Sequence, residues 1–184
     1  MKLSARKFCM PFAAFLLALS LPVAAQIVRH PTTKEDARPN DPKVPDSYVL
    51  SGKFDRVLVL RAKNKTDLLT EMEKQVKAQN IKNAVILSGI GSVRGYRFHN
   101  VTGRDYPVPD MFVSAPNTPA DFIGMNGYVV NGVIHAHIIL ALGDNKGTTV
   151  SGHLEKGTEV LTFAVVTLGV LNTDLGRVDD LTYR

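Results

Sequence analysis

The chain has 184 residues, with 22 basic and 17 acidic side chains, five histidines and a single cysteine, Cys9. Its length fits one domain, and one cysteine excludes a disulfide within the chain. The net charge of +5 does not gather into a stripe of lysine and arginine, so composition does not indicate a nucleic-acid-binding protein.

Residues 1–25 have the features of a secretory signal peptide. A basic start is followed by an apolar run over 12–21 and by Val23-Ala24-Ala25, a fitting cleavage site before Gln26. The run is shorter than the ~20 residues that span a bilayer. We therefore expect export to the periplasm or the extracellular space. Removing the three basic residues of this leader lowers the net charge from +5 to +2.

Residues 26–46 are rich in proline and charge, which predicts a flexible segment. His30 lies in it and is expected to have no role. The remaining residues, 47–184, form the predicted folded domain. At its start, 48–63 indicates two short strands or one bent strand, and the apolar run Val57–Leu60 favours a sheet covered on both faces.

A helix is predicted over 64–79, because Leu68, Leu69, Met72 and Val76 recur at helical spacing. Asn64 or Thr66 would cap its start, and Asn80 would end it.

The rest of the domain is predicted to be mostly strand. Residues 84–101 indicate two strands joined by a glycine-rich bend or bulge, and the prolines of 102–119 indicate a long loop. A strand over 121–130, a tight turn at Asn131-Gly132 and a buried strand over 159–171 follow, before a polar tail. The predicted class is therefore α+β, with a mainly antiparallel sheet and one or two helices.

Three histidines occur close together in GVIHAHIILALGDNKGTTVSGHLEKG, residues 132–157. His135 and His137 are two apart on a predicted strand, so they share a face. A three-residue loop centred on Asn145 would pair His137 with His153 across a hairpin. A two- or four-residue loop would turn His153 away, so this placement requires an odd loop.

Three imidazoles on one face predict a metal site, with Zn²⁺ as the expected ion and other divalent metals as alternatives. The candidate ligands are His135, His137 and His153. His99 is interpreted as a structural histidine rather than a ligand. The opposing interpretation is that the three histidines fill polar positions at a subunit interface without a metal.

Other side chains are candidates for chemistry beside this site. Glu155 and Glu159 are the nearest carboxylates in sequence and are the candidate catalytic acids or bases. Arg94 and Arg97 are the candidate contacts for an anionic substrate. Each of the four also has the ordinary interpretation of a solvated charge.

HAHIILALGDNKGTTVSGHLEKGTEV resembles the signature of the PPC (plants and prokaryotes conserved) domain, and the resemblance runs over 47–183. It implies a PPC-like fold of mainly antiparallel strands, assembly as a homotrimer and kinship with the zinc enzyme acetolactate decarboxylase. Some members are described as DNA-binding. The chain departs from the pattern at Ser151, where glycine is usual, and at Ala164, where a glutamate is often found.

These features predict an exported metal-binding protein that binds or acts on a small anionic molecule. If it is an enzyme, a metal-dependent hydrolase or a decarboxylase-like activity is expected. A nucleic-acid-binding module and a structural or interaction domain without metal are the alternatives.

Overall fold

The computed structural model describes residues 24–28, 39–103 and 109–180, and for residues 24–28 it describes the backbone alone. Most of the expected leader and His30 lie outside this part, so the predicted export and the predicted segment boundaries stay predictions. Strand β1 (Ala24–Val28) spans the expected cleavage point and pairs with β4 (Asp110–Ala115). Within the described residues, no helix is long and apolar enough to cross a membrane.

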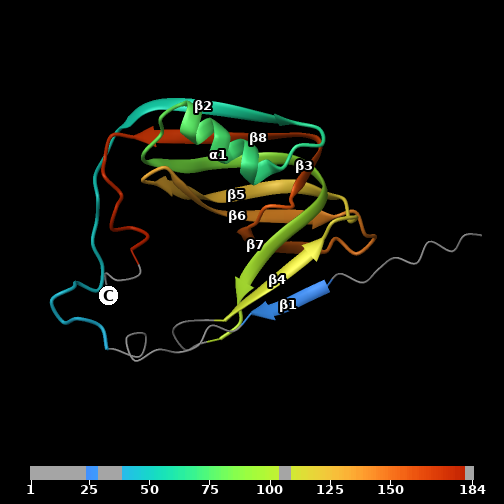
Figure 1. The fold of residues 1–184 in the computed structure, drawn as a ribbon, viewed down its shortest axis with the longest axis horizontal. Helices are drawn as coiled ribbons and strands as arrows, with labels where there is room; N and C mark the ends of the chain where they lie inside the picture. The colour runs from blue at the N-terminus through green and yellow to red at the C-terminus, as the bar shows by residue number, and fades with distance from the viewer. Residues whose placement is uncertain (1–23, 29–38, 104–108, 181–184) are drawn as a thin grey trace, which may run out of the picture.

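The fold is mainly one antiparallel sheet, as expected, with a single helix, α1, in the described part of the chain (Figure 1). Its helical content is therefore smaller than an α+β class implies. The remaining elements are β2 (Phe54–Lys63), α1 (Leu68–Ala78), β3 (Ala84–Val101), β5 (Ala120–Val130), β6 (Val133–Leu142), β7 (Thr149–Leu154) and β8 (Glu159–Leu171).

The long strand β3 organises the sheet. Its first half pairs with β5 and β8, and its second half pairs with β4 and, at two positions, with β7. Because β5 also pairs with β6 and β6 with β7, the strands β3, β5, β6 and β7 pair in a closed circuit. Strand β2 extends the sheet beyond β8.

Helix α1 buries Leu68, Met72 and Val76 in the core, as their spacing predicts, and lies across the sheet near β2 and β8 (Figure 1). Its start is later than predicted. Asp67 is the cap and accepts a hydrogen bond from the backbone N–H of Thr70 at 2.8 Å. The cap shifts because the preceding residues turn to bond β8: the backbone N–H of Lys65 donates to Val160.

Two predictions about the middle of the chain were wrong. Strand β3 is one continuous strand of 18 residues instead of two, although the bulge predicted for its glycine-rich stretch is confirmed by register shifts in its pairing with β8. The predicted loop over 102–119 contains β4, which pairs with β3 from Tyr96 opposite Ala115 to Val101 opposite Asp110. The prolines that suggested a loop flank this six-residue strand, so they mark its ends.

Along β2 only one face of the sheet is covered, whereas the sequence predicted that both faces would be covered. Leu60 and Ala62 are buried, whereas Val59 is 68% exposed. Ile90 on β3 is 56% exposed, and Ile123 on β5 is also exposed. The register places these three apolar side chains on the same sheet face. We refer to Val59, Ile90 and Ile123 as the apolar face.

Candidate metal centre

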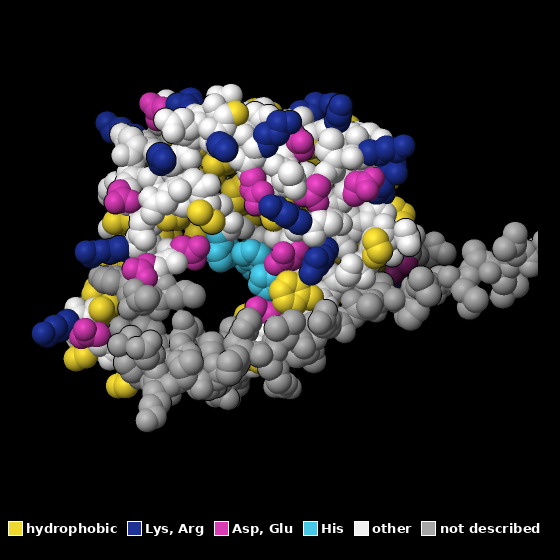
Figure 2. Space-filling model, in the orientation of Figure 1, with side chains coloured by type: hydrophobic (Ala, Val, Ile, Leu, Met, Phe, Trp, Pro, Cys, Tyr) yellow, Lys and Arg dark blue, Asp and Glu magenta, His cyan; other side chains and the backbone are white. Residues whose placement is uncertain are grey.

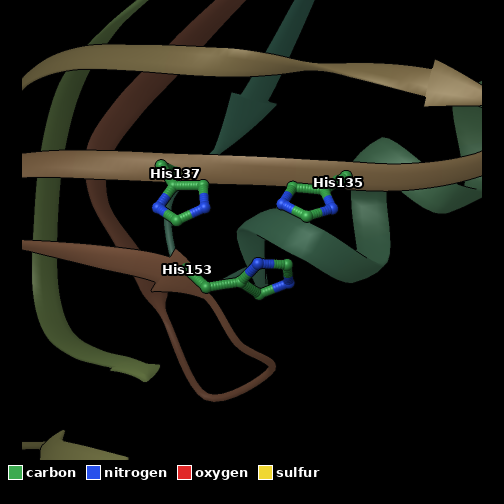
Figure 3. Close-up of side chains that lie close together, drawn as sticks. All are labelled: His135, His137 and His153. Carbon is green, nitrogen blue, oxygen red and sulfur yellow. The ribbon is translucent and has the colours of Figure 1, made fainter. Parts of the chain in front are cut away.

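His135, His137 and His153 come together as the sequence predicts. His135 and His137 lie on β6, and His153 lies on β7 directly opposite His137. All three imidazoles extend from the same side of this hairpin (Figure 3). Each offers a nitrogen, and the three nitrogens lie within 4.8 Å of one another. The histidine side chains lie together at the surface on one face of the molecule, with acidic side chains beside them (Figure 2).

The hairpin loop has the odd length that this arrangement requires. Pairing ends with Ala141 opposite Thr149, and the backbone N–H of Leu142 donates to the carbonyl of Thr148 at 2.8 Å. Five residues, 143–147, form the loop instead of the predicted three. Adding one residue on each side of Asn145 preserves the register, so His153 still faces His137.

Two glycines allow the strands to approach one another at the histidines. Gly127 on β5 has a φ of 144°, and a Cβ there would collide with the carbonyl oxygen of His135. Gly152 precedes His153, and a Cβ there would lie 2.8 Å from the carbonyl oxygen of His99. A larger residue at either position would push apart the strands that carry the imidazoles.

His99 is a fourth member of the cluster, which sequence reasoning missed. It lies opposite His153 where β3 pairs with β7, and the two rings stack at a centroid distance of 4.5 Å. With His153 and Glu155 it forms a second group whose ligand atoms lie within 4.8 Å of one another. No local spacing signals this contact, because it depends on the pairing of strands more than 50 residues apart.

Glu155 lies at the cluster and Glu159 pairs elsewhere. The Nδ1 of His99 donates to Oε1 of Glu155 at 2.8 Å. The fully buried hydroxyl of Thr158 bonds both Arg97 and the carbonyl of Glu155, which fixes the turn carrying Glu155 against β3. Glu159 instead forms an ion pair with Arg94 at 3.2 Å.

Arg97 lies two residues from His99 on the same strand face, so it flanks the histidines. Its guanidinium group stacks on the ring of Phe112 at 5.5 Å, and that ring lies 5.1 Å from the ring of His99. The structure thus brings Arg97 and Glu155 to the histidines, whereas Arg94 and Glu159 pair with each other.

The environment favours neutral imidazoles, the form that binds a metal. The pKa of His153 is lowered from its usual 6.5 to about 4, first by burial and then by the neighbouring His99, His135 and His137. The pKa of His137 is also lowered, by partial removal from water and then by His135 and His99. Protons therefore compete weakly with a metal at these two side chains.

The donor set fits Zn²⁺. At a Zn–N distance of about 2.0–2.1 Å, tetrahedral nitrogens lie roughly 3.3 Å apart. The ring centroids of His135 and His137 lie 5.5 Å apart, and those of His135 and His153 lie 4.7 Å apart. The three nitrogens lie within 4.8 Å of one another, so small rotations of the side chains would bring them to this spacing, and three protein ligands would leave a fourth position for water or substrate.

Asp179, in the polar tail, contacts this cluster from outside the hairpin. One of its carboxylate oxygens accepts a hydrogen bond from the Tyr128 hydroxyl at 3.1 Å, and the other lies 3.3 Å from Nδ1 of His135. Burial, followed by the interaction with Asp179, raises the pKa of Tyr128 to about 12. The tail was predicted only to be polar, and its sequence gives no signal for this contact.

Solved structures share this fold. A metal-containing protein from Archaeoglobus fulgidus is 22% identical, with 70% of this chain and 88% of that chain covered and a TM-score of 0.57. A PPC protein from Pyrococcus horikoshii is 19% identical, with 74% and 94% covered and a TM-score of 0.58. A proposed DNA-binding protein from Bacteroides thetaiotaomicron is 16% identical, with 69% and 98% covered and a TM-score of 0.52. These identities show the fold alone.

Comparison with curated proteins found no match. Comparison with protein families matches residues 49–172 to the Plants and Prokaryotes Conserved (PCC) domain. This match covers the helix, the long strand β3 and the histidine hairpin, and it confirms the resemblance stated from the sequence. The chain therefore belongs to the Plants and Prokaryotes Conserved domain family, abbreviated PCC or PPC.

Proposed function

We propose that this PCC-domain protein binds Zn²⁺ through His135, His137 and His153 and uses the site to bind or transform a small anionic molecule. The convergence of three imidazoles with nitrogens within 4.8 Å is the observation that carries the proposal. The lowered pKa values of His137 and His153 support it, because a metal binds the neutral ring.

Zinc bound here would supply a Lewis acid that polarises a carbonyl group or lowers the pKa of a water molecule to about 7. The chain itself supplies groups for the rest of a reaction. Glu155, held by His99 at 2.8 Å, can accept or return a proton beside the histidines. Arg97 can bind a carboxylate or phosphate of the substrate. Hydrolysis or decarboxylation of a small oxo-acid or ester fits these roles.

Charge favours a small anion over a nucleic acid. Glu155 and Asp179 are both bonded to histidines of the cluster, and acidic side chains lie beside it in Figure 2. Such a surface repels the phosphates of a nucleic acid. Nucleic-acid binding requires several lysines and arginines that neutralise those phosphates. With Zn²⁺ bound, the metal and Arg97 outweigh the two carboxylates and leave a local positive charge for one compact anion.

Metal content tests the proposal. Protein purified without chelator is expected to carry stoichiometric zinc, because the three imidazole donors are already gathered in the fold. Elemental analysis measures the content, and removal with a chelator followed by titration measures rebinding. Protein that carries no zinc and takes up none would overturn the metal site and favour the interpretation of a polar cluster at an interface.

Self-association is a second expected property. We propose that the apolar face of Val59, Ile90 and Ile123 is covered by further copies of the chain, consistent with the trimer that the family resemblance implies. Val59→Glu is expected to convert the assembly to monomers, since a carboxylate would be buried. Light scattering after size exclusion measures the mass. Lys77→Glu, at an exposed position of α1, is the control and should keep the wild-type mass. A monomeric wild type would contradict the proposal.

A further inference from the structure

The C-terminal segment, residues 173–180, lies beyond the residues that match the family, yet it is anchored to the sheet. Leu175 is buried, and its backbone N–H donates to the side-chain oxygen of Asn83 at 3.4 Å. The N–H of Val178 donates to the carbonyl of Leu175 at 2.8 Å and closes a turn. This turn brings Asp179 to His135, 44 positions away in the chain.

Asp179 is held between two partners. Its Oδ1 accepts from the Tyr128 hydroxyl on β5 at 3.1 Å, and its Oδ2 faces Nδ1 of His135 on β6 at 3.3 Å. A carboxylate can only accept, so the ring nitrogen facing it carries the proton. A neutral imidazole has one N–H, and protonation at Nδ1 leaves Nε2 of His135 as the free donor for a metal.

We propose that Asp179 is a positioning residue that fixes the tautomer and the ring orientation of His135, so that Nε2 is available to the metal. Tyr128 fixes Asp179 in turn, because its hydroxyl occupies the second carboxylate oxygen. Metal-binding histidines generally donate their other N–H to such a partner. The inference rests on the proposed zinc site, but its first consequence, the tautomer, is measurable without metal.

Long-range ¹H–¹⁵N NMR on the metal-free protein above neutral pH distinguishes Nδ1–H from Nε2–H for each histidine. His135, assigned from a variant lacking it, is expected as Nδ1–H in the wild type. Asp179→Asn should shift it toward Nε2–H, because an amide can donate to Nδ1. Asp174→Asn is the matched control: Asp174 lies in the same segment and accepts from the backbone N–H of Gly176, which an amide oxygen can also do.

Zinc affinity, measured by competition with a chromophoric chelator, is the second readout. Asp179→Asn is expected to raise the Kd by about 10- to 100-fold, as losing a partner of a metal-binding histidine does, whereas Asp174→Asn should not change it. An unchanged tautomer together with an unchanged Kd would overturn the proposal. If Asp179→Asn fails to fold, Tyr128→Phe decides by the same two measurements: a partial loss of Nδ1–H supports the proposal, and no loss overturns it.

The two proposals fail differently. A wild type that binds no zinc overturns the metal site, while the tautomer in the metal-free protein still tests Asp179. A wild type that binds zinc with an affinity independent of Asp179, and with His135 in an unchanged tautomer, leaves the metal site standing and removes the role of Asp179.

Discussion

Alanine in place of His137 is expected to abolish stoichiometric zinc uptake. The site offers three imidazoles, and removing one leaves two donors, too few to hold the ion. The loss should exceed the roughly 10- to 100-fold effect typical of residues that only orient a ligand. His137 is exposed, so its removal should leave the fold intact. Competition titration of the metal-free protein measures the affinity, and thermal unfolding confirms the fold.

His30→Ala and His99→Ala separate the ligands from the other histidines. His30 lies in the proline-rich segment and serves as the composition-matched control, with unchanged uptake expected. His99→Ala should retain uptake with reduced affinity, because the Nδ1 of His99 is engaged by Glu155 while its ring stacks on His153. Complete loss in His99→Ala with retained binding in His137→Ala would move the metal to the second group, formed by His99, His153 and Glu155.

The histidine hairpin was predictable because the pairing of His137 with His153 depends only on whether the loop has an odd or an even number of residues. Alternation along β6 fixes which side chains share a face, and any odd loop centred on Asn145 pairs His137 with His153. The prediction therefore survived an error in loop length. The turn at Asn131-Gly132 was equally accessible, since both residues adopt positive φ, at 51° and 83°, as a two-residue hairpin requires.

The parts of the site that were missed depend on contacts between distant segments. His99 meets His153 only because β3 continues past its glycines and pairs with β7. Strand β4 was not predicted because prolines lie close to both of its ends, so that the local composition indicated a loop. Asp179 reaches His135 through a turn whose anchor, Leu175 against Asn83, has no sequence pattern. Local periodicity describes elements, whereas these contacts follow from how the elements pack.

The structure makes Glu155 a stronger candidate for an acid or base than its sequence position alone did, and this matters because Ala164 replaces a glutamate often found in the family. Position 164 is fully buried on β8 and carries no acid. Glu155 lies on the turn after β7 and is bonded to the cluster through His99. Although the glutamate often found at position 164 in the family is absent, Glu155 places a carboxylate beside the imidazoles. Under the proposed function, Glu155 would therefore take the acid/base role.

Lowering the pH is expected to weaken zinc binding less steeply than at three ordinary imidazoles. An imidazole with a pKa of 6.5 must release a proton below that pH before it binds the metal, which costs up to about tenfold in affinity per pH unit. The pKa of His153 is about 4, so its ring is already neutral down to that pH. Between pH 6.5 and 4.5 the rise in Kd should therefore be up to roughly 100-fold smaller than it would be if His153 had a pKa of 6.5. His137, whose pKa is also lowered, adds to the effect.

The same shift determines how the metal-free fold responds to acid. In the unfolded chain His153 takes up a proton below about pH 6.5, whereas in the fold it resists protonation until about pH 4. Between these two pH values the unfolded state binds more protons than the folded state. As far as His153 is concerned, the free energy of unfolding is therefore highest above pH 6.5 and declines as the pH falls toward 4. NMR titration of the metal-free protein measures the pKa of His153, and competition titrations across this range measure the slope of zinc affinity. A titration of His153 near 6.5, with a three-proton slope, would contradict the expectation and place the rings in open solvent.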